Sequence, residues 1–333
     1  MKIAIVGATG AVGREMVADL ENSPIKDISL SLFASERSAG EKISFRGKTH
    51  EVKPFSLGLL AGHDACLMSA GGGFSRQHAK AISELGVTVI DNSSAWRMVD
   101  GVPLVVPEVN GSILKNLPRG SIIANPNCST IQMVVALKPL MDRFGIQQVL
   151  VSTYQSVSGT GQKGIRELSV QVEASFKFAE ANPQVYAQPI AFNVLPAIDV
   201  MDASGHCFEE EKMVRETRKI FNKPTLDVMA STVRVPVYHC HCETVAVRLA
   251  KPVSRAEVIE CLSGFSGLTV HLEDSHSTFP TPRGVTGSQG VHVSRIRIPM
   301  DQERSDWVQM WVVADNLKKG AATNAVQILS AIS

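Results

Sequence analysis

Short apolar runs alternate with amphipathic stretches through residues 1–144. The apolar runs at 2–7, 28–34, 64–69, 87–90 and 121–124 predict buried strands, and helical periods at 11–20, 75–85 and 129–144 predict helices between and after them. Strands that alternate with helices indicate a parallel sheet. This part of the chain therefore predicts a Rossmann-like domain.

The pattern changes from Val149 onward. Longer alternating runs at 232–249 and 291–298 predict antiparallel strands with polar faces, and residues 320–332 predict an amphipathic helix that returns to the first domain. We therefore expect an α/β protein with two domains. The Rossmann-like domain covers 1–127 and is completed by a C-terminal helix at 315–333, and an α+β domain with a mixed, largely antiparallel sheet covers 128–314.

Composition narrows the class of protein. The 333 residues are 44% hydrophobic and 20% charged, which suits a large core, and the net charge of +1 provides no overall field for nucleic acid or a membrane surface. The first apolar run ends at Gly7, so we expect no secretory signal. No apolar stretch is long enough to cross a bilayer, so we expect no membrane span. The six cysteines form no paired C-x-x-C motifs, which indicates a reducing compartment and a cytoplasmic protein.

The first strand runs directly into Gly7, Gly10 and Gly13, which are spaced as G-x-x-G-x-x-G and open an amphipathic helix. Such glycines allow a tight turn and let a pyrophosphate approach the backbone at the helix N-terminus. The spacing is a variant of G-x-G-x-x-G, and a glycine-rich turn without a ligand is the alternative. Its position after the first strand favours dinucleotide binding.

The end of the second strand bears on the choice of nucleotide. Arg37 lies between Ser35 and Ser38, and an arginine flanked by hydroxyls suits a 2′-phosphate, so the sequence favours NADP. Glu36 leaves NAD open, because an acidic residue at this place binds the ribose hydroxyls of NAD. The strand at 64–69 is followed by Gly71-Gly72-Gly73, where a cofactor could lie against the backbone; a flexible turn without a ligand is the alternative.

Cys128 stands in Asn-Pro-Asn-Cys-Ser-Thr, between the strand that ends at Ala124 and the helix that follows. The unpaired N–H groups and positive dipole of a first helical turn lower a thiol pKa and stabilise an oxyanion. Cys128 is therefore a candidate nucleophile. The alternative is a small buried apolar residue.

A second chemical cluster lies at residues 234–243, which read RVPVYHCHCE. On one continuous strand, His239 and His241 would share a face and Cys240 and Cys242 the other, which disfavours a four-ligand metal site. A structural metal joined by His206 and Cys207 is one alternative. The other is a single histidine that acts as acid or base, and the pattern does not say which histidine it is.

Nearly the whole chain resembles the aspartate-semialdehyde dehydrogenase family. The resemblance is carried by GATGAVG at 7–13, SERSAG at 35–40, DNSSAWRM at 91–98, NPNCST at 125–130, STYQSVSGTG at 152–161, EEEKM at 209–213, RVPVYHCHCET at 234–244 and DNLKKGAA at 315–322. Together these motifs are highly specific. They imply an NADP-binding domain followed by a catalytic and dimerisation domain.

The resemblance also implies roles for individual residues. Cys128 would be the nucleophile that forms an acyl-thioester, with His241 as acid/base. Gln155, Glu209 and Arg234 would orient the substrate, with Gln155 counted among the catalytic residues and Glu210 an alternative to Glu209; Arg97 and Lys212 would hold phosphate. The implied cofactor-binding residues are Gly7, Thr9, Gly10, Ala11, Val12, Gly13, Ser35, Arg37, Ser38, Gly71, Ser158, Gly159 and Asn316.

The implied reaction is NADPH-dependent reductive dephosphorylation of L-aspartyl-4-phosphate to L-aspartate 4-semialdehyde and phosphate, without a metal. It belongs to lysine, diaminopimelate, methionine and threonine biosynthesis. The two anionic groups of this substrate suit two arginines, the residue type that binds carboxylate and phosphate in bidentate fashion. The family forms homodimers, sometimes dimers of dimers, through the second domain.

This chain departs from the family at one place. The family usually reads Gly-His-Ser-Glu, whereas this chain reads Cys240-His241-Cys242-Glu243, which adds bulk beside the base and an oxidisable thiol. Three alternatives stay open: an N-acetyl-glutamyl-phosphate reductase, a non-catalytic nucleotide-binding paralogue, and a redox or metal-responsive protein that uses Cys240 and Cys242. The first fits less well, because that family tends toward Gly-Cys at the nucleophile.

Overall fold

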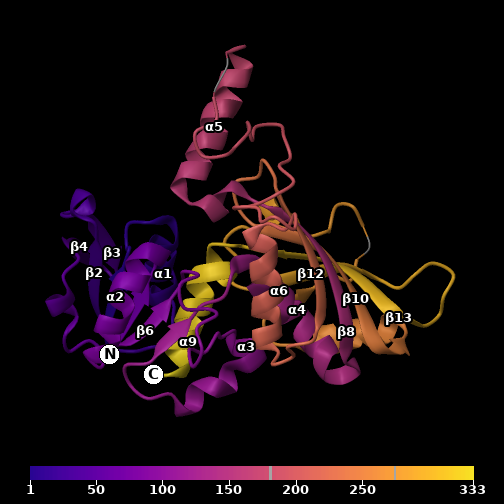
Figure 1. Ribbon diagram of the computed structural model, residues 1–333, viewed down its shortest axis with the longest axis horizontal. Helices are drawn as coiled ribbons and strands as arrows, with labels where there is room; N and C mark the ends of the chain where they lie inside the picture. Colours follow the sequence, from indigo (N-terminus) through magenta and orange to yellow (C-terminus); the bar gives the residue numbers. More distant parts are fainter. Residues whose placement is uncertain (180–181, 274) are drawn as a thin grey trace. The chain divides into compact units, whose positions relative to one another are not determined.

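The computed structural model describes residues 1–179, 182–273 and 275–333 (Figure 1). The chain forms two compact units, of which the first contains residues 1–127 and 320–333 and the second contains residues 128–319. Each unit is built around its own sheet.

The first unit contains a seven-stranded sheet in the order β3-β4-β2-β1-β5-β6-β7. All neighbouring pairs are parallel except β3 with β4. The strands are β1 (Lys2–Val6), β2 (Ser29–Ala34), β3 (Lys42–Phe45), β4 (Lys48–Pro54), β5 (Ala65–Met68), β6 (Thr88–Asp91) and β7 (Ile122–Ala124). The five predicted strands and the parallel sheet are confirmed, whereas the β3-β4 hairpin was not predicted because its polar residues show little apolar alternation.

Helices cover both faces of this sheet. Along β1, Ile3 and Ile5 pack into one apolar cluster with α1 (Ala11–Glu21) and α9 (Thr323–Ala331), while Ala4 and Val6 pack into another with α2 (Gly72–Glu84). Burial on both faces explains why the strand is apolar at every position from Ile3 to Val6. Shorter helical turns in this unit are η1 (Glu36–Ser38), η2 (Leu57–Leu60), α3 (Pro107–Asn110) and η3 (Gly111–Asn116).

The second unit contains a six-stranded mixed sheet in the order β11-β12-β13-β10-β8-β9. Three neighbouring pairs are antiparallel, whereas β8 with β9 and β11 with β12 are parallel. The strands are β8 (Ile146–Gln155), β9 (Asp227–Arg234), β10 (His241–Val253), β11 (Leu268–Val270), β12 (Val291–Arg297) and β13 (Ser305–Ala314). The expectation of a mixed, largely antiparallel sheet is confirmed.

Helix α4 (Cys128–Phe144) packs against β10 and β13 in this unit, beside α6 (Phe208–Ile220) and α7 (Arg255–Ser263) (Figure 1). Most residues of α4 are buried, including the polar Ser129, Thr130 and Gln132. The remaining helical segments are η4 (Val157–Thr160), α5 (Gln162–Phe176), α8 (Pro282–Val285) and a π-helix, η5 (Lys318–Ala322).

One expectation about the second unit is wrong. The run at 232–249 is not a single strand, because β9 ends at Arg234 and β10 begins at His241. Pro236 and the positive φ of +69° at Cys240 interrupt it. His239 lies outside both strands, so strand alternation does not place it on the face of His241. Cys240 and Cys242 do share one apolar cluster.

None of the helices formed by residues 1–179, 182–273 and 275–333 has the length and apolar composition that crossing a bilayer requires.

Candidate active site

Three predicted site residues form a row across the sheet of the second unit. Arg234 on β9 is in register with Gln155 on β8, and Gln155 is in register with His241 on β10. Their side chains are 6%, 1% and 0% exposed, respectively. In-register residues on neighbouring strands point to the same face. The sheet therefore gathers three residues that are far apart in sequence.

A second polar row lies directly behind the first. Because side chains two residues apart on a strand share a face, the next row is Thr232, Thr153 and Glu243, all fully buried. The row after that is apolar, with Ala230, Val151 and Val245. Polar character on this face therefore decreases with distance from the end of the sheet that holds His241.

The neighbours of His241 determine which ring nitrogen carries its proton. The backbone N–H of Ser156 donates to Nδ1 at 3.1 Å, and the Ser156 hydroxyl lies 3.2 Å from the same atom. A nitrogen that accepts from a backbone N–H is unprotonated, so this network assigns the proton of the neutral ring to Nε2. Burial, and then the positive charge of Arg234, lower the pKa of His241 to about 3. The ring is therefore neutral near pH 7 and presents an Nε2–H donor.

Other hydrogen bonds of Ser156 hold the same end of the sheet in place. The Ser156 carbonyl accepts a 2.7 Å hydrogen bond from Arg234, and the Ser156 hydroxyl donates to Asn316 Oδ1 at 3.1 Å. Asn316 Oδ1 also accepts from the hydroxyl of Ser158 and from the backbone N–H of Cys240. Asn316, predicted as a cofactor residue, is thus 3% exposed and bonded within the His241 region.

Helix α6 brings two further predicted residues to the row. Gln155 donates to Glu209 at 3.0 Å, and the Glu209 carboxylate is 2.6 Å from the Lys212 ammonium. Lys212 is also 3.4 Å from Asp199. Glu210 is used differently, because its carboxylate accepts from the backbone N–H groups of Cys207 and Thr232. The structure therefore brings Glu209, rather than Glu210, to Gln155.

A cavity of about 400 Å³ opens beside this cluster. It is lined by Gly159, Thr160, Val185, Tyr186, Ala197, Ile198, Asp199, Glu209, Lys212 and Arg234. The backbone at Gly159 lies close to two residues of the row, because a Cβ there would be 2.9 Å from the Arg234 guanidinium and 3.3 Å from the His241 ring. The cavity combines two cationic and two acidic side chains, which suits a small polar ligand with both anionic and cationic groups.

Cys128 is the first residue of α4 and is half-buried. Its helix belongs to the second unit, as do the residues of the row and the cavity. A thiol at the start of a 17-residue helix lies in the positive field of the helix dipole. The predicted helix start is confirmed, and the role of Cys128 as nucleophile stays a prediction.

Cys240 and Cys242 pack with Val285, Trp311 and Val313. Burial raises the pKa of Cys240 to about 12 and raises the pKa of Cys242 further. A buried thiol with a raised pKa is a poor nucleophile, which disfavours a redox function for this pair. Among the residues that the structure describes, no three His, Cys, Asp or Glu side chains are placed to hold a metal ion.

The first unit contains the glycine loop. Gly7 has a φ of +87°, and a Cβ at Gly13 would lie 2.1 Å from the Gly7 carbonyl oxygen, so both positions require glycine for backbone packing. Gly10 is exposed and directly precedes Ala11 and Val12, where α1 begins. The helix N-terminus is therefore accessible.

The predicted nucleotide residues lie on neighbouring segments of this unit. Thr9 is 3.2 Å from Ser38 through their hydroxyls, and Ser35 and Arg37 are exposed at η1, directly after β2. Gly71, after β5, has a φ of +86° and open space where a Cβ would lie. Because parallel strands end at the same edge, these three loops meet at the carboxyl ends of β1, β2 and β5.

Arg97 also lies in the first unit and is 8% exposed. Its guanidinium donates to the backbone carbonyls of Asn125 at 3.0 Å and Asn92 at 2.9 Å. It is therefore a buried side chain that joins two loops at the carboxyl ends of β6 and β7.

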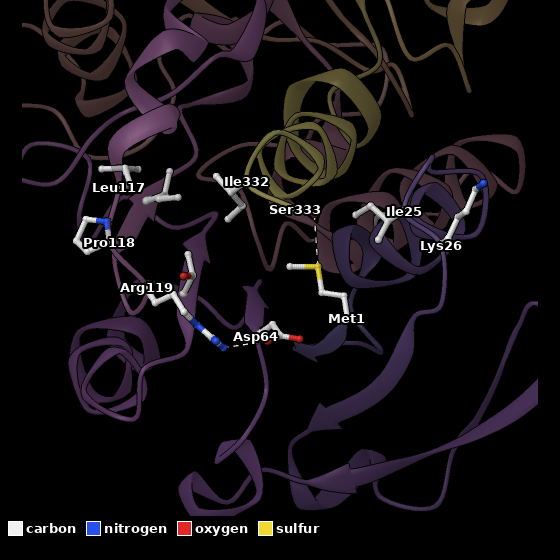
Figure 2. A pocket seen from close by; sticks show the side chains of 11 residues that line it. Met1, Ile25, Lys26, Asp64, Leu117, Pro118, Arg119, Ile332 and Ser333 are labelled. Atoms are coloured by element: carbon white, nitrogen blue, oxygen red, sulfur yellow. Dashed lines mark hydrogen bonds and ion pairs between the residues drawn. The ribbon is translucent and has the colours of Figure 1, made fainter.

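Another cavity, of about 480 Å³, contains none of the predicted site residues (Figure 2). Figure 2 shows Met1 and Asp64 at the amino ends of β1 and β5, with Arg119 reaching Asp64 at 2.9 Å. Ligands of open α/β sheets bind at the carboxyl ends of the strands. This cavity therefore lies at the wrong edge for a dinucleotide.

Sequence reasoning missed Ser156, Tyr186 and Asp199. Ser156 lies inside the STYQSVSGTG motif but has no chemical signature of its own, because its backbone N–H makes the contact with His241 Nδ1. Asp199 has a φ of +75°, which is unusual for a residue other than glycine and could have been recognised only from the structure.

Comparisons with known proteins agree with this architecture. The family model described as "Semialdehyde dehydrogenase, NAD binding domain" matches residues 2–117, and the one described as "Semialdehyde dehydrogenase, dimerisation domain" matches residues 137–319. The aspartate-semialdehyde dehydrogenase of Aquifex aeolicus is 47% identical over 329 residues, which cover 98% of this chain and 96% of that protein.

Solved structures give the same result. Aspartate semialdehyde dehydrogenase II of Vibrio cholerae, complexed with ASA, superposes with a TM-score of 0.92 at 43% identity and covers 99% of this chain and 97% of its own. The Candida albicans enzyme with NADP has a TM-score of 0.73 at 25% identity, and the match covers 99% of this chain and 97% of that one. With two domain models and full-length relatives in agreement, this chain belongs to the aspartate-semialdehyde dehydrogenase family.

Proposed function

We propose that this chain catalyses the NADPH-dependent reductive dephosphorylation of L-aspartyl-4-phosphate to L-aspartate 4-semialdehyde and phosphate, a step of amino-acid biosynthesis. The observation that carries the proposal is the row of Arg234, Gln155 and His241 beside the Glu209–Lys212 pair, in a chain of this family. Full-length relatives named aspartate-semialdehyde dehydrogenase support the substrate. The Vibrio cholerae neighbour with ASA supports it as well.

The polar groups of the cavity match the groups of this substrate. The Arg234 guanidinium would bind the α-carboxylate in bidentate fashion, and Glu209 would accept from the α-ammonium group. Lys212 lines the same cavity and would hold phosphate. A phosphate-binding role is also proposed for Arg97. Gln155, bonded to Glu209, would orient the carbonyl that reacts.

Cys128 would begin the reaction as a thiolate. Its sulfur attacks the acyl carbon, a C–S bond forms, the C–O bond to phosphate breaks and phosphate leaves with the electron pair. The N-terminal position on α4 favours both the thiolate and the oxyanion formed on the same carbon. The product of this half-reaction is an acyl-thioester on Cys128.

His241 would act on the oxygen of this carbon. As a neutral ring with the proton on Nε2, it donates a hydrogen bond to the oxyanion in each tetrahedral intermediate, in the way that neutral imidazoles polarise carbonyls in other enzymes. A nicotinamide cofactor, when bound, would supply the hydride that reduces the thioester. The resulting oxyanion then re-forms the C=O bond and expels the Cys128 thiolate, so aldehyde release needs no net proton transfer. The acid/base role implied by the family stays a prediction.

The first unit fits NADP. Its exposed α1 N-terminus after Gly10 suits the pyrophosphate, and the exposed Arg37 beside Ser35 and Ser38 suits a 2′-phosphate. The matched NAD binding domain model supports a nicotinamide cofactor, and the Candida albicans neighbour with NADP favours the phosphorylated form. The matched dimerisation domain model supports a homodimer.

The decisive experiment runs the reaction in reverse. Purified protein is given L-aspartate 4-semialdehyde, NADP and phosphate, and NADPH is measured by absorbance, beside Cys128→Ala and Arg37→Ala. We expect phosphate-dependent reduction in the wild type, none in Cys128→Ala, and a loss of preference for NADP over NAD in Arg37→Ala. A folded wild type that binds NADP but shows no such activity would overturn the proposal.

A further inference from the structure

An acid and an amide are buried together in the second unit without a use in the chemistry described above. Glu243 on β10 is 0% exposed and Gln132 on α4 is 1% exposed. None of their four side-chain oxygen and nitrogen atoms has an aligned hydrogen-bond partner among the residues that the structure describes. Leaving such atoms unpaired costs about 1–3 kcal/mol each, so the pair needs an explanation.

Each of the two residues lies near one of the proposed reacting groups, His241 or Cys128. Glu243 lies two residues after His241 on the same strand and therefore on the same face. Gln132 lies four residues after Cys128 and therefore on the same side of α4, one turn further along. Helix α4 packs on β10, so the two residues lie one step behind the nucleophile and the histidine.

The electrostatic environment of Glu243 includes the Gln132 amide. Burial raises the pKa of Glu243 well above its ordinary value, hydrogen bonding by the Gln132 amide opposes this rise, and the negative charge of Glu209 adds to it. Among the described residues, no basic side chain forms an ion pair with Glu243. An ionised carboxylate here would be a buried charge without a counter-charge.

The donors and acceptors of the two side chains also favour a neutral, protonated Glu243 carboxyl. The Gln132 amide contains both a donor and an acceptor, and a carboxylate can only accept. A protonated carboxyl can donate to the amide oxygen while its carbonyl oxygen accepts from the amide nitrogen. Two hydrogen bonds would then satisfy both side chains.

We propose that Glu243 is a positioning residue that pairs as a neutral carboxylic acid with the Gln132 amide and so joins the helix that begins at Cys128 to the strand that begins at His241. The pair does not touch the substrate. It sets the distance between the sulfur and the Nε2–H donor, and it holds the second polar row in place behind the first.

The test uses three variants. Glu243→Gln keeps two hydrogen bonds, because two amides can pair in the same way, whereas Glu243→Met and Gln132→Met each remove them at similar volume. We expect Glu243→Gln to retain kcat within about threefold. We expect both Met variants to lose kcat by about tenfold or more with little change in KM, and the double Met variant to lose no more than either single variant.

The inference rests on the proposed function for its kcat readout, so a second readout is independent of that function. The rate of Cys128 alkylation by iodoacetamide is followed against pH, by mass spectrometry of the Cys128 peptide in protein without nucleotide. We expect the alkylation profile to be unchanged in Glu243→Gln and displaced in both Met variants. This measurement reports the reactivity of the Cys128 thiol even if the substrate is a different acyl phosphate.

Two results would overturn the inference. One is a Glu243→Gln variant as impaired as Glu243→Met, which would show that the charge or the proton of Glu243 is needed. The other is a folded Met variant with wild-type kcat and alkylation profile, which would leave the pair a purely structural feature. If Glu243→Met does not fold, Gln132→Met removes the same pair from the other side.

Discussion

The glycine loop of the first unit and the first polar row of the second are both proposed to bind ligands, but they are assembled in different ways. The loop lies within residues 7–13 and depends on its own backbone contacts, such as those of Gly13 with Gly7. This row joins Gln155, Arg234 and His241 from three strands, and only the register of the sheet makes them neighbours. A local motif is therefore sensitive to its own backbone, whereas an assembled site is sensitive to its neighbours across the sheet.

The largest effect is expected within the loop. Gly13→Ala places a Cβ 2.1 Å from the Gly7 carbonyl oxygen and 2.8 Å from the Ala8 Cα, so the backbone must move. We expect a loss of about 3 kcal/mol in the free energy of unfolding and weaker NADP binding, measured by denaturant titration and fluorescence titration. Gly73→Ala, in α2 with open space around the new Cβ, is the control and should change stability by less than about 1 kcal/mol. Equal stability of the two variants would contradict the conclusion that backbone packing requires glycine at position 13.

The assembled site is tested by Gly159→Ala. The new Cβ would displace the Arg234 guanidinium and the His241 ring, which lie 2.9 Å and 3.3 Å from it. We expect kcat/KM to fall about 100-fold while the melting temperature changes little, because a shift near 1 Å in a reacting group has this size of effect. Gly264→Ala, in the same unit with nothing near its Cβ, should keep full activity. Wild-type kinetics in Gly159→Ala would show that the row is not the reacting site.

Acid should destabilise the second unit through His241. The pKa of this residue is lowered to about 3 in the folded protein, whereas it is near 6.5 when unfolded. Below pH 6.5 the unfolded state therefore binds a proton that the folded state does not, and the contribution to stability is lost as the pH falls from about 6.5 toward 3. Between pH 6.5 and 5 we expect a loss of about 2 kcal/mol.

The measurement compares denaturant unfolding at these two pH values in the wild type and in His241→Asn. The variant has no imidazole to titrate, so the difference between the proteins isolates this group from the many carboxylates. The same pH dependence in both proteins would show that His241 is not held neutral.

The smallest effect concerns the segment that turns into β10. Cys240 adopts a φ of +69°, which costs an L-residue about 1–2 kcal/mol, while its buried thiol packs with Val285 and Trp311. Cys240→Ala loses the packing and keeps the strain, whereas Cys240→Gly loses both. We expect the glycine variant to be more stable than the alanine variant by about 1 kcal/mol, measured by thermal unfolding. The reverse order would mean that the backbone is unstrained at this position.

Features that depend on neighbouring residues could be predicted from the sequence, whereas features assembled from distant residues could not. Hydrophobic periodicity, together with the residues that begin and end each run, located the parallel strands of the first unit and the start of α4. Buried strands and helix starts have such local signatures. The same approach joined β9 and β10 into one strand, since alternation continues on both sides of the turn at 235–240. It also overlooked the β3-β4 hairpin, which has little apolar pattern.

The sequence by itself determined the glycine loop, the position of Cys128 at the start of a helix, and the family motifs, because each depends on residues that are covalent neighbours. Only the tertiary structure decided which residues of distant motifs meet. It selected Glu209 over Glu210, placed Ser156 on the His241 ring, and buried Glu243 near Gln132. The physical reason is that strand register and helix packing, rather than sequence distance, set these contacts, and that burial then sets the charge each group carries.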